Sequence, residues 1–106
     1  MKTARLRPLA KQDLSDQAGY YADVAGQPLA NRFVDEALAA LVTVEGNPGI
    51  GSTRWSRHEV VPPLRAWRVE RLPVVWLYFE REDHVDVVRL LGQRQDLAAI
   101  LAAGLD

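Results

Sequence analysis

The stretch LRAWRVERLPVVWLYFEREDHVDVVRLLGQRQDL, residues 64–97, decides the fold of this chain. Its centre, residues 74–79, is an uninterrupted run of apolar side chains, mostly β-branched or aromatic. Such a run is too short for an ordinary helix and predicts a strand covered on both faces. The segments on either side, residues 64–72 and 84–91, follow through connections so short that only antiparallel neighbours are feasible. Three consecutive strands in a meander are therefore expected.

Two amphipathic helices are predicted before the meander. Between residues 8 and 25, apolar residues recur at spacings of three and four, as one face of a helix requires, and Gly26 follows as a typical helix end. Residues 28–45 carry a broader apolar stripe that ends at EGNP. Because the link between the two helices is very short, they should fold back as an antiparallel hairpin whose joint apolar face needs a sheet to cover.

The remaining segments complete the expected architecture. Residues 3–7 alternate polar and apolar side chains and predict a short edge strand, and Asp96 is placed to cap a last helix. Residues 46–63 are the least regular segment; a loop of this length tends to be functional or to contain a strand, so part of it is expected to be extended. The predicted order is β-α-α-β-β-β-α in one α+β domain, with a small antiparallel sheet packed against a helical hairpin.

Composition excludes several classes of protein. Thirteen Lys and Arg against fourteen Asp and Glu give a net charge of −1, so there is no overall attraction to nucleic acid or membranes. The chain has no cysteine, which excludes disulfides and thiolate metal sites and fits a reducing compartment. The start of the chain lacks the apolar core of a signal peptide, and no apolar run approaches the roughly 20 residues of a membrane helix. A cytoplasmic, soluble protein is expected.

Charge is unevenly distributed along the chain. Residues 46–71 hold five Arg against two Glu, net +3, whereas residues 80–106 hold three Arg against six acidic residues, net −3. Within the basic stretch, Trp55 lies in the irregular segment and is expected to be exposed, whereas Trp76 lies in the apolar run and is expected to fill the core. Trp67 is either a partner anchor or core, because aromatic and Arg side chains dominate interface hot spots.

Two strand arginines are predicted to point toward an apolar side. Arg65 alternates onto the face of Trp67 and Val69, and Arg89 onto the face that includes Val85, Val87 and Leu91. A guanidinium there needs a carboxylate, a backbone carbonyl or an anionic partner. Two interpretations stay open: a positive cleft that receives an acidic protein segment or a phosphate, and an internal ion pair, for example with Asp13 or Asp96.

No metal or nucleophilic site is predicted. His58 and His84 are far apart and lack neighbours with ligand spacing, and neither has a Ser or Cys partner. We therefore expect no catalytic residues, metal or cofactor. The candidate binding residues, including one arginine between the last strand and the last helix, are Arg54, Trp55, Arg65, Trp67, Arg89 and Arg94.

Four local patterns, in this order, resemble the ParE branch of the ParE/RelE toxin superfamily. They are LRPLAKQDLSDQAGYY, ANRFVDEALAAL followed by NPGIG, LRAWRVERLP, and WLYFERE with VDVVRLLGQRQDL. The resemblance covers nearly the whole chain and implies the β-α-α-β-β-β fold of the family. Arg65 and Arg94 fall where the RelE branch carries cleft arginines, and the chain departs from the family at Gly92, where most ParE-like sequences have His.

The resemblance also implies a function and partners. ParE-branch toxins inhibit DNA gyrase by binding it and trapping it on DNA, and a ParD-type antitoxin silences them by wrapping the toxin with its C-terminal segment. A hetero-oligomer with such an antitoxin is therefore expected, without membrane or sequence-specific nucleic-acid binding. Because both helical stripes are wider than one small sheet face, we expect the antitoxin to use an apolar groove beside the hairpin.

Two alternatives remain. A RelE-like, ribosome-dependent mRNA endonuclease needs groups that transfer protons as well as arginines. The only lysines are Lys2 and Lys11, and Ile100 stands where a RelE-type tyrosine would fall. The other alternative is a degenerate module that binds an antitoxin and has no toxic target.

Overall fold

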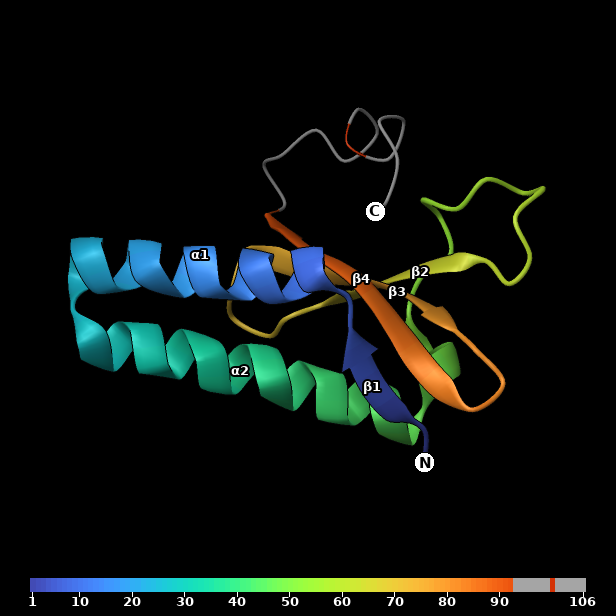
Figure 1. The fold of residues 1–106 in the computed structure, drawn as a ribbon, viewed down its shortest axis with the longest axis horizontal. Helices are drawn as coiled ribbons and strands as arrows, with labels where there is room; N and C mark the ends of the chain where they lie inside the picture. The colour runs from blue at the N-terminus through green and yellow to red at the C-terminus, as the bar shows by residue number, and fades with distance from the viewer. Residues whose placement is uncertain (93–99, 101–106) are drawn as a thin grey trace.

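The computed structural model describes residues 1–92 and Ile100, and these residues form two layers. A hairpin of two long helices makes one layer and a four-stranded sheet makes the other (Figure 1). The predicted α+β arrangement is confirmed. In chain order the elements are β1 (Thr3–Leu6), α1 (Pro8–Ala25), α2 (Gln27–Gly46), a single 3-10 turn (Pro48–Ile50), β2 (Leu64–Arg68), β3 (Val74–Glu80) and β4 (His84–Gly92).

The sheet is mixed rather than purely antiparallel. Its order is β1-β4-β3-β2, with β3 antiparallel to β2 and β4 as the meander predicted. β1 lies at the edge, as expected, but pairs with β4 in parallel. The expectation of an antiparallel sheet was wrong at this edge, because short connections constrain only the meander, whereas β1 reaches β4 through both helices and two strands.

The helical hairpin turns at one glycine. Gly26 separates α1 from α2 with φ of 95°, a conformation that side-chain-bearing residues rarely adopt, and its N–H closes α1 by donating to the carbonyl of Ala22. α2 then buries six residues toward the sheet, and α1 buries Ala10. The predicted hairpin is thus present, with its boundaries at the expected residues.

β3 is buried on both faces, as predicted. Trp76 and Tyr78 belong to the core beneath the helices, whereas Val75 and Leu77 pack in a second cluster on the outer face, against which Ile100 also lies. Trp76 is 0% exposed and its indole Nε1–H donates to the carbonyl of Ala37 in α2, 2.8 Å away. Its predicted role in the core is confirmed.

A bulge in β4 changes which side chains share a face. The pairing with β3 steps from Leu77–Arg89 to Tyr78–Val87, so Val88 is the extra residue. Val87 accordingly packs beneath the helices, and Leu91 packs on the outer face. The prediction that Leu91 shares the face of Val85 and Val87 was therefore wrong, because strict alternation fails at a bulge.

The irregular segment is only slightly extended. In residues 47–63, Ser52 forms an isolated antiparallel bridge with Ala66 of β2, and the rest consists of the 3-10 turn, turns, bends and irregular backbone. The predicted last helix, with Asp96 as its cap, and Arg94 lie outside the described residues. None of the helices described is both long enough and apolar enough to span a membrane.

Candidate functional site

Arg65 is held by backbone carbonyls at the root of the irregular segment. Its Nη1 donates to the carbonyls of Gly49, 3.1 Å away, and Gly51, 2.8 Å away. β2 places Arg65 beside Tyr78, whose hydroxyl accepts the N–H of Gly51 at 2.9 Å and donates to the carbonyl of Pro48 at 2.7 Å. The sequence required a carboxylate, a backbone carbonyl or an anionic partner for this guanidinium, and the structure shows backbone carbonyls.

No second titratable side chain in residues 1–92 hydrogen-bonds to this pair. Burial raises the pKa of Tyr78, although its bond to Gly51 and the charge of Arg65 act in the opposite direction. In residues 1–92, no carboxylate or imidazole hydrogen-bonds to either Arg65 or Tyr78. The same residues contain no group of three side chains suited to a metal ion. The arrangement therefore fixes the backbone, and the Tyr78 hydroxyl is engaged with backbone groups.

Arg89 forms the internal ion pair that was one of the two open interpretations. Its Nε donates to Oδ2 of Asp13 at 2.7 Å and its Nη2 to Oδ1 at 3.0 Å, and the same carboxylate accepts the N–H of Leu90 at 3.0 Å. The side chains are only 20% and 14% exposed. A bidentate pair of this kind ties α1 to β4.

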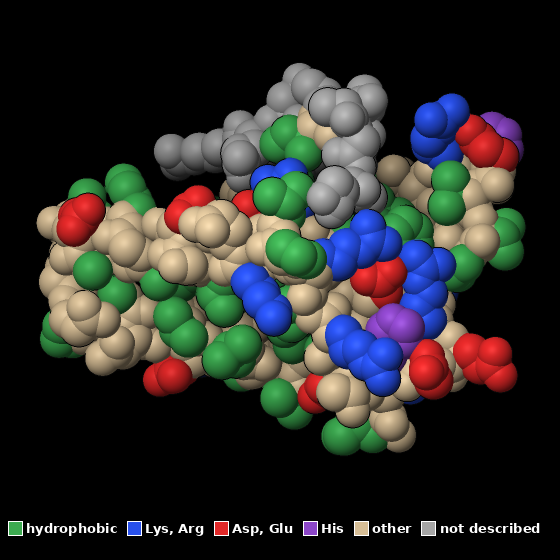
Figure 2. Space-filling model, viewed as in Figure 1, with side chains coloured by type: hydrophobic (Ala, Val, Ile, Leu, Met, Phe, Trp, Pro, Cys, Tyr) green, Lys and Arg blue, Asp and Glu red, His purple; other side chains and the backbone are tan. Residues whose placement is uncertain are grey.

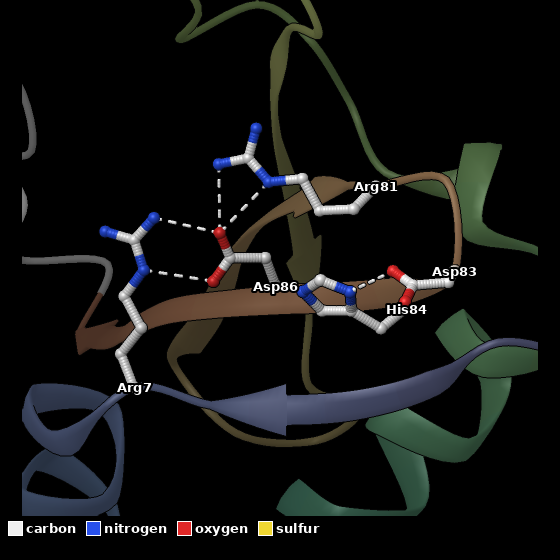
Figure 3. Close-up of polar contacts among 5 residues, drawn as sticks. All are labelled: Arg7, Arg81, Asp83, His84 and Asp86. Atoms are coloured by element: carbon white, nitrogen blue, oxygen red, sulfur yellow. Dashed lines mark hydrogen bonds and ion pairs between the residues drawn. The ribbon is translucent and has the colours of Figure 1, made fainter.

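Sequence reasoning missed a second arginine–carboxylate cluster on the outer face of the sheet. Arg7 and Arg81 approach Asp86 from two sides, each donating twice to its carboxylate over 2.9 to 3.1 Å (Figure 3). The hydrogen bond from Arg7, helped by Arg81, holds the pKa of Asp86 below its usual value, although burial opposes the shift. The alternation of side chains in β1 and β4 puts these charged residues on the outer face. Which of them pair could not be read from the sequence, because it depends on the parallel register of β1 and β4.

The neighbouring histidine pairs with the turn that precedes β4. Nδ1 of His84 lies 2.6 Å from Oδ1 of Asp83, and this contact lowers the pKa of the Asp83 carboxyl. Figure 2 shows that charged side chains of both signs gather over this part of the sheet, whereas the helical hairpin carries few on the same side. Because the charges alternate in sign, the cluster is internally compensated.

Arg54 and Trp55 are exposed together in the irregular segment. The Arg54 guanidinium lies 5.1 Å from the centre of the Trp55 ring, and Trp55 is 36% exposed, as expected from its basic surroundings. Trp67 is half-buried against the core beneath the helices. The five described candidates therefore do not form one site: Arg54, Trp55 and Arg65 belong to the irregular segment and its root, whereas Trp67 and Arg89 lie elsewhere in the sheet.

A groove of about 470 Å³ lies toward the Gly26 end of the hairpin, where both helices meet the β2–β3 turn. Its walls are apolar, and its rim carries two arginines that sequence reasoning did not single out. One of them, Arg71, has φ of 67°, the left-handed conformation that is unusual for a side-chain-bearing residue. The groove is lined by Tyr21, Leu29, Arg32, Phe33, Glu36, Arg71 and Leu72.

Comparisons with known proteins agree with this architecture. The family model described as "ParE toxin of type II toxin-antitoxin system, parDE" matches residues 4–97. A search of curated proteins finds no match. Among solved structures, the chain is similar to one from the "Chromosomal ParDE TA system from P. aeruginosa", with a TM-score of 0.73 and 20% identity over 87% of this chain and 96% of that one. At this identity the likeness shows a shared fold.

Proposed function

This chain belongs to the ParE toxin family of type II toxin–antitoxin systems, and we propose that it inhibits DNA gyrase by binding it and is neutralised by a ParD-type antitoxin. The observation that carries the proposal is the family match, which runs from β1 through β4 and beyond. The similar solved structure, titled as a ParDE system, supports an antitoxin partner.

We propose that the action is not enzymatic. Cleavage of RNA would need a base near the 2′-hydroxyl and an acid near the leaving oxygen, both beside the arginines that hold the phosphate. Arg65 instead donates to Gly49 and Gly51, and Arg89 pairs with Asp13. Tyr78, the titratable side chain beside Arg65, has its hydroxyl engaged with the backbone. Among the described residues, this arrangement favours binding over RNA cleavage.

The proposed antitoxin site is the groove near the Gly26 end of the hairpin. Its apolar walls include Leu29 and Phe33, and its rim carries Arg32, Arg71 and Glu36. An amphipathic antitoxin helix would bury apolar side chains in such a groove and place acidic ones against the arginines. Arg71 is 74% exposed in its side chain and its contact with Glu36 is long, at 3.5 Å, so its guanidinium is available to a partner.

The test of the main proposal uses the purified, antitoxin-free chain. We expect it to stop supercoiling by DNA gyrase and to leave linear DNA after detergent and protease treatment, because a trapped cleavage complex holds broken strands. The same preparation should leave mRNA intact on translating ribosomes. Cut mRNA with normal supercoiling would replace the proposal with ribonuclease activity, and no effect in either assay would leave only an antitoxin-binding module.

The groove is tested by two matched substitutions on α2. Leu29→Lys places a charge in the groove, whereas Leu38→Lys places one at a position of the same helix that is already 44% exposed. We expect the first to weaken binding of the antitoxin encoded beside the toxin gene at least tenfold, about the effect of losing one hot spot, and the second to leave it unchanged. Equal affinities would move the antitoxin site elsewhere.

A further inference from the structure

Residues 53–61 form an arm that projects from a firmly held root (Figure 1). On the incoming side, Ser52 exchanges two backbone hydrogen bonds with Ala66 of β2, over 2.9 and 2.8 Å. On the outgoing side, Oγ of Ser56 accepts the N–H of Leu64 at 2.9 Å. Tyr78 and Arg65 fix the backbone just before the arm. The arm is therefore presented from a rigid base, which lowers the entropic cost of binding through it.

The side chains of the arm are cationic, aromatic and open to solvent. Arg57 is 81% exposed, His58 is fully exposed, and the Trp55 ring lies under the Arg54 guanidinium. Trp55 is 36% exposed and lies against the Arg54 guanidinium, so the arm presents an aromatic face and a cation together. The core of the protein accounts for Trp76 and for most of Trp67, but it does not account for Trp55.

The arm carries net positive charge in a chain that is slightly acidic overall. Residues 53–61 hold Arg54 and Arg57 against Glu59, net +1, so the other residues of a chain with net charge −1 sum to −2. Arg57 donates to Glu59 at 2.9 Å, but both side chains are more than half exposed, and an exposed pair of this kind adds little and exchanges readily. Both arginines can therefore reach an external anion.

We propose that the arm is a nucleic-acid contact, in which Arg54 and Arg57 meet backbone phosphates and Trp55 stacks on an exposed base. Cations that follow a backbone, combined with an aromatic platform, are the usual means of binding DNA strands without reading sequence. The inference deepens the proposed function, since it assigns the arm to the DNA that gyrase holds. The groove proposed for the antitoxin lies at the other end of β2, so the arm is a separate surface.

The first experiment measures DNA binding by the toxin alone. Fluorescence anisotropy with labelled single-stranded and duplex oligonucleotides, over a series of salt concentrations, gives the affinity and its salt dependence. We expect Arg54→Ala/Arg57→Ala to make the negative slope of log K against log salt shallower by about two, one for each lost phosphate contact. Arg5→Ala/Lys11→Ala removes the same charge from exposed positions of β1 and α1 and should leave the slope unchanged.

Two single substitutions separate stacking from charge. Trp55→Ala should weaken binding of single-stranded DNA about tenfold or more and affect duplex DNA less, because a paired base offers no free face. Glu59→Gln should strengthen binding of both, since it releases Arg57. Absence of DNA binding by the wild-type chain at low salt, or equal losses in the arm variant and its charge-matched control, would overturn the proposal. Unchanged melting temperatures would show that the variants are folded.

The second experiment tests the role of the arm separately from the proposed inhibition of gyrase and binding of the antitoxin. Each variant is assayed for gyrase inhibition and for antitoxin affinity. We expect the arm double variant to lose gyrase inhibition at least tenfold and to bind the antitoxin as the wild type does. If the wild type leaves gyrase unaffected, the proposed function fails while the anisotropy series still decides the arm. If the arm variant instead loses antitoxin affinity and keeps DNA affinity, the arm is a protein contact and the inference is wrong.

Discussion

The helical hairpin and the irregular segment rest on the same face of β3, but they are held there by different kinds of contact. Trp76 packs under α2 within a core that many buried side chains share. Tyr78, two residues further along the same strand, holds the irregular segment through its hydroxyl bonds to Gly51 and Pro48. A shared apolar core tolerates adjustment at any one position, whereas a segment held by a few polar groups depends on each of them.

The largest effect on stability is expected at Trp76, whose side chain both packs in the apolar core and donates a hydrogen bond to the backbone. Trp76→Ala would leave a cavity beneath α2 and remove the bond to the carbonyl of Ala37, and should lower the free energy of unfolding by about 3–5 kcal/mol. Trp55→Ala removes the same ring from the arm and should change it by about 0.5 kcal/mol or less. Urea denaturation measures both. Similar values for the two variants would contradict the distinction between core and arm.

A smaller and more local effect is expected at Tyr78. Tyr78→Phe keeps the buried ring but leaves the N–H of Gly51 and the carbonyl of Pro48 without their partner, at a cost of roughly 1–3 kcal/mol. Amide hydrogen exchange should quicken in residues 48–56 and stay slow in α2. Tyr20→Phe, at a tyrosine that is 62% exposed, is the matched control. Faster exchange throughout the sheet would mean that the irregular segment is part of the core after all.

Gly51 tests the same comparison because the segment lies directly against Tyr78 of β3 there. A Cβ at this position would lie 2.6 Å from the Tyr78 hydroxyl and 3.0 Å from Cβ of Arg65. Gly51→Ala therefore requires the backbone to move away from β3, with the same pattern of exchange as Tyr78→Phe. Gly49→Ala, whose Cβ would have no neighbour closer than 3.9 Å, is the control.

The same contrast explains how much the sequence could predict. The meander and the helices follow from local patterns, since the apolar run of β3 and the periodicity of α1 and α2 each report burial within one element. The bulge at Val88, the parallel pairing of β1 and the groove depend on how distant elements meet. For Arg65 the sequence predicted only that the guanidinium needs a partner. It could not predict the carbonyls of Gly49 and Gly51 as that partner, because backbone groups leave no mark in the sequence.

The distant charge pairs show the same limit. Asp13 was one of two carboxylates that the sequence offered as ion-pair partners of the strand arginines, and it pairs with Arg89. Asp86 was not singled out from the sequence: Arg7, 79 residues away, faces it through the parallel register of β1 and β4, and Arg81 binds it from the other side. Sequence reasoning found that Arg89 needs a partner but missed the cluster around Asp86, whose pairing depends on the arrangement of the sheet.

The smallest effect is expected on the outer face, where Asp86 binds Arg7 and Arg81 (Figure 3). Because the folded state holds the pKa of Asp86 below its unfolded value, its contribution to stability is present above the unfolded pKa and is lost as pH falls through the folded pKa. Asp86→Asn should therefore flatten the loss of stability on acidification, measured by urea denaturation between neutral pH and pH values below the usual aspartate range. The effect is modest because both arginines remain about one-third exposed and solvent screens the pairs. Glu82→Gln, which removes an exposed carboxylate from the turn before β4, should keep the wild-type slope. An unchanged slope in Asp86→Asn would mean that the arginines stabilise the fold through packing of their stems, and the outer face would then resemble the core rather than the polar root of the arm.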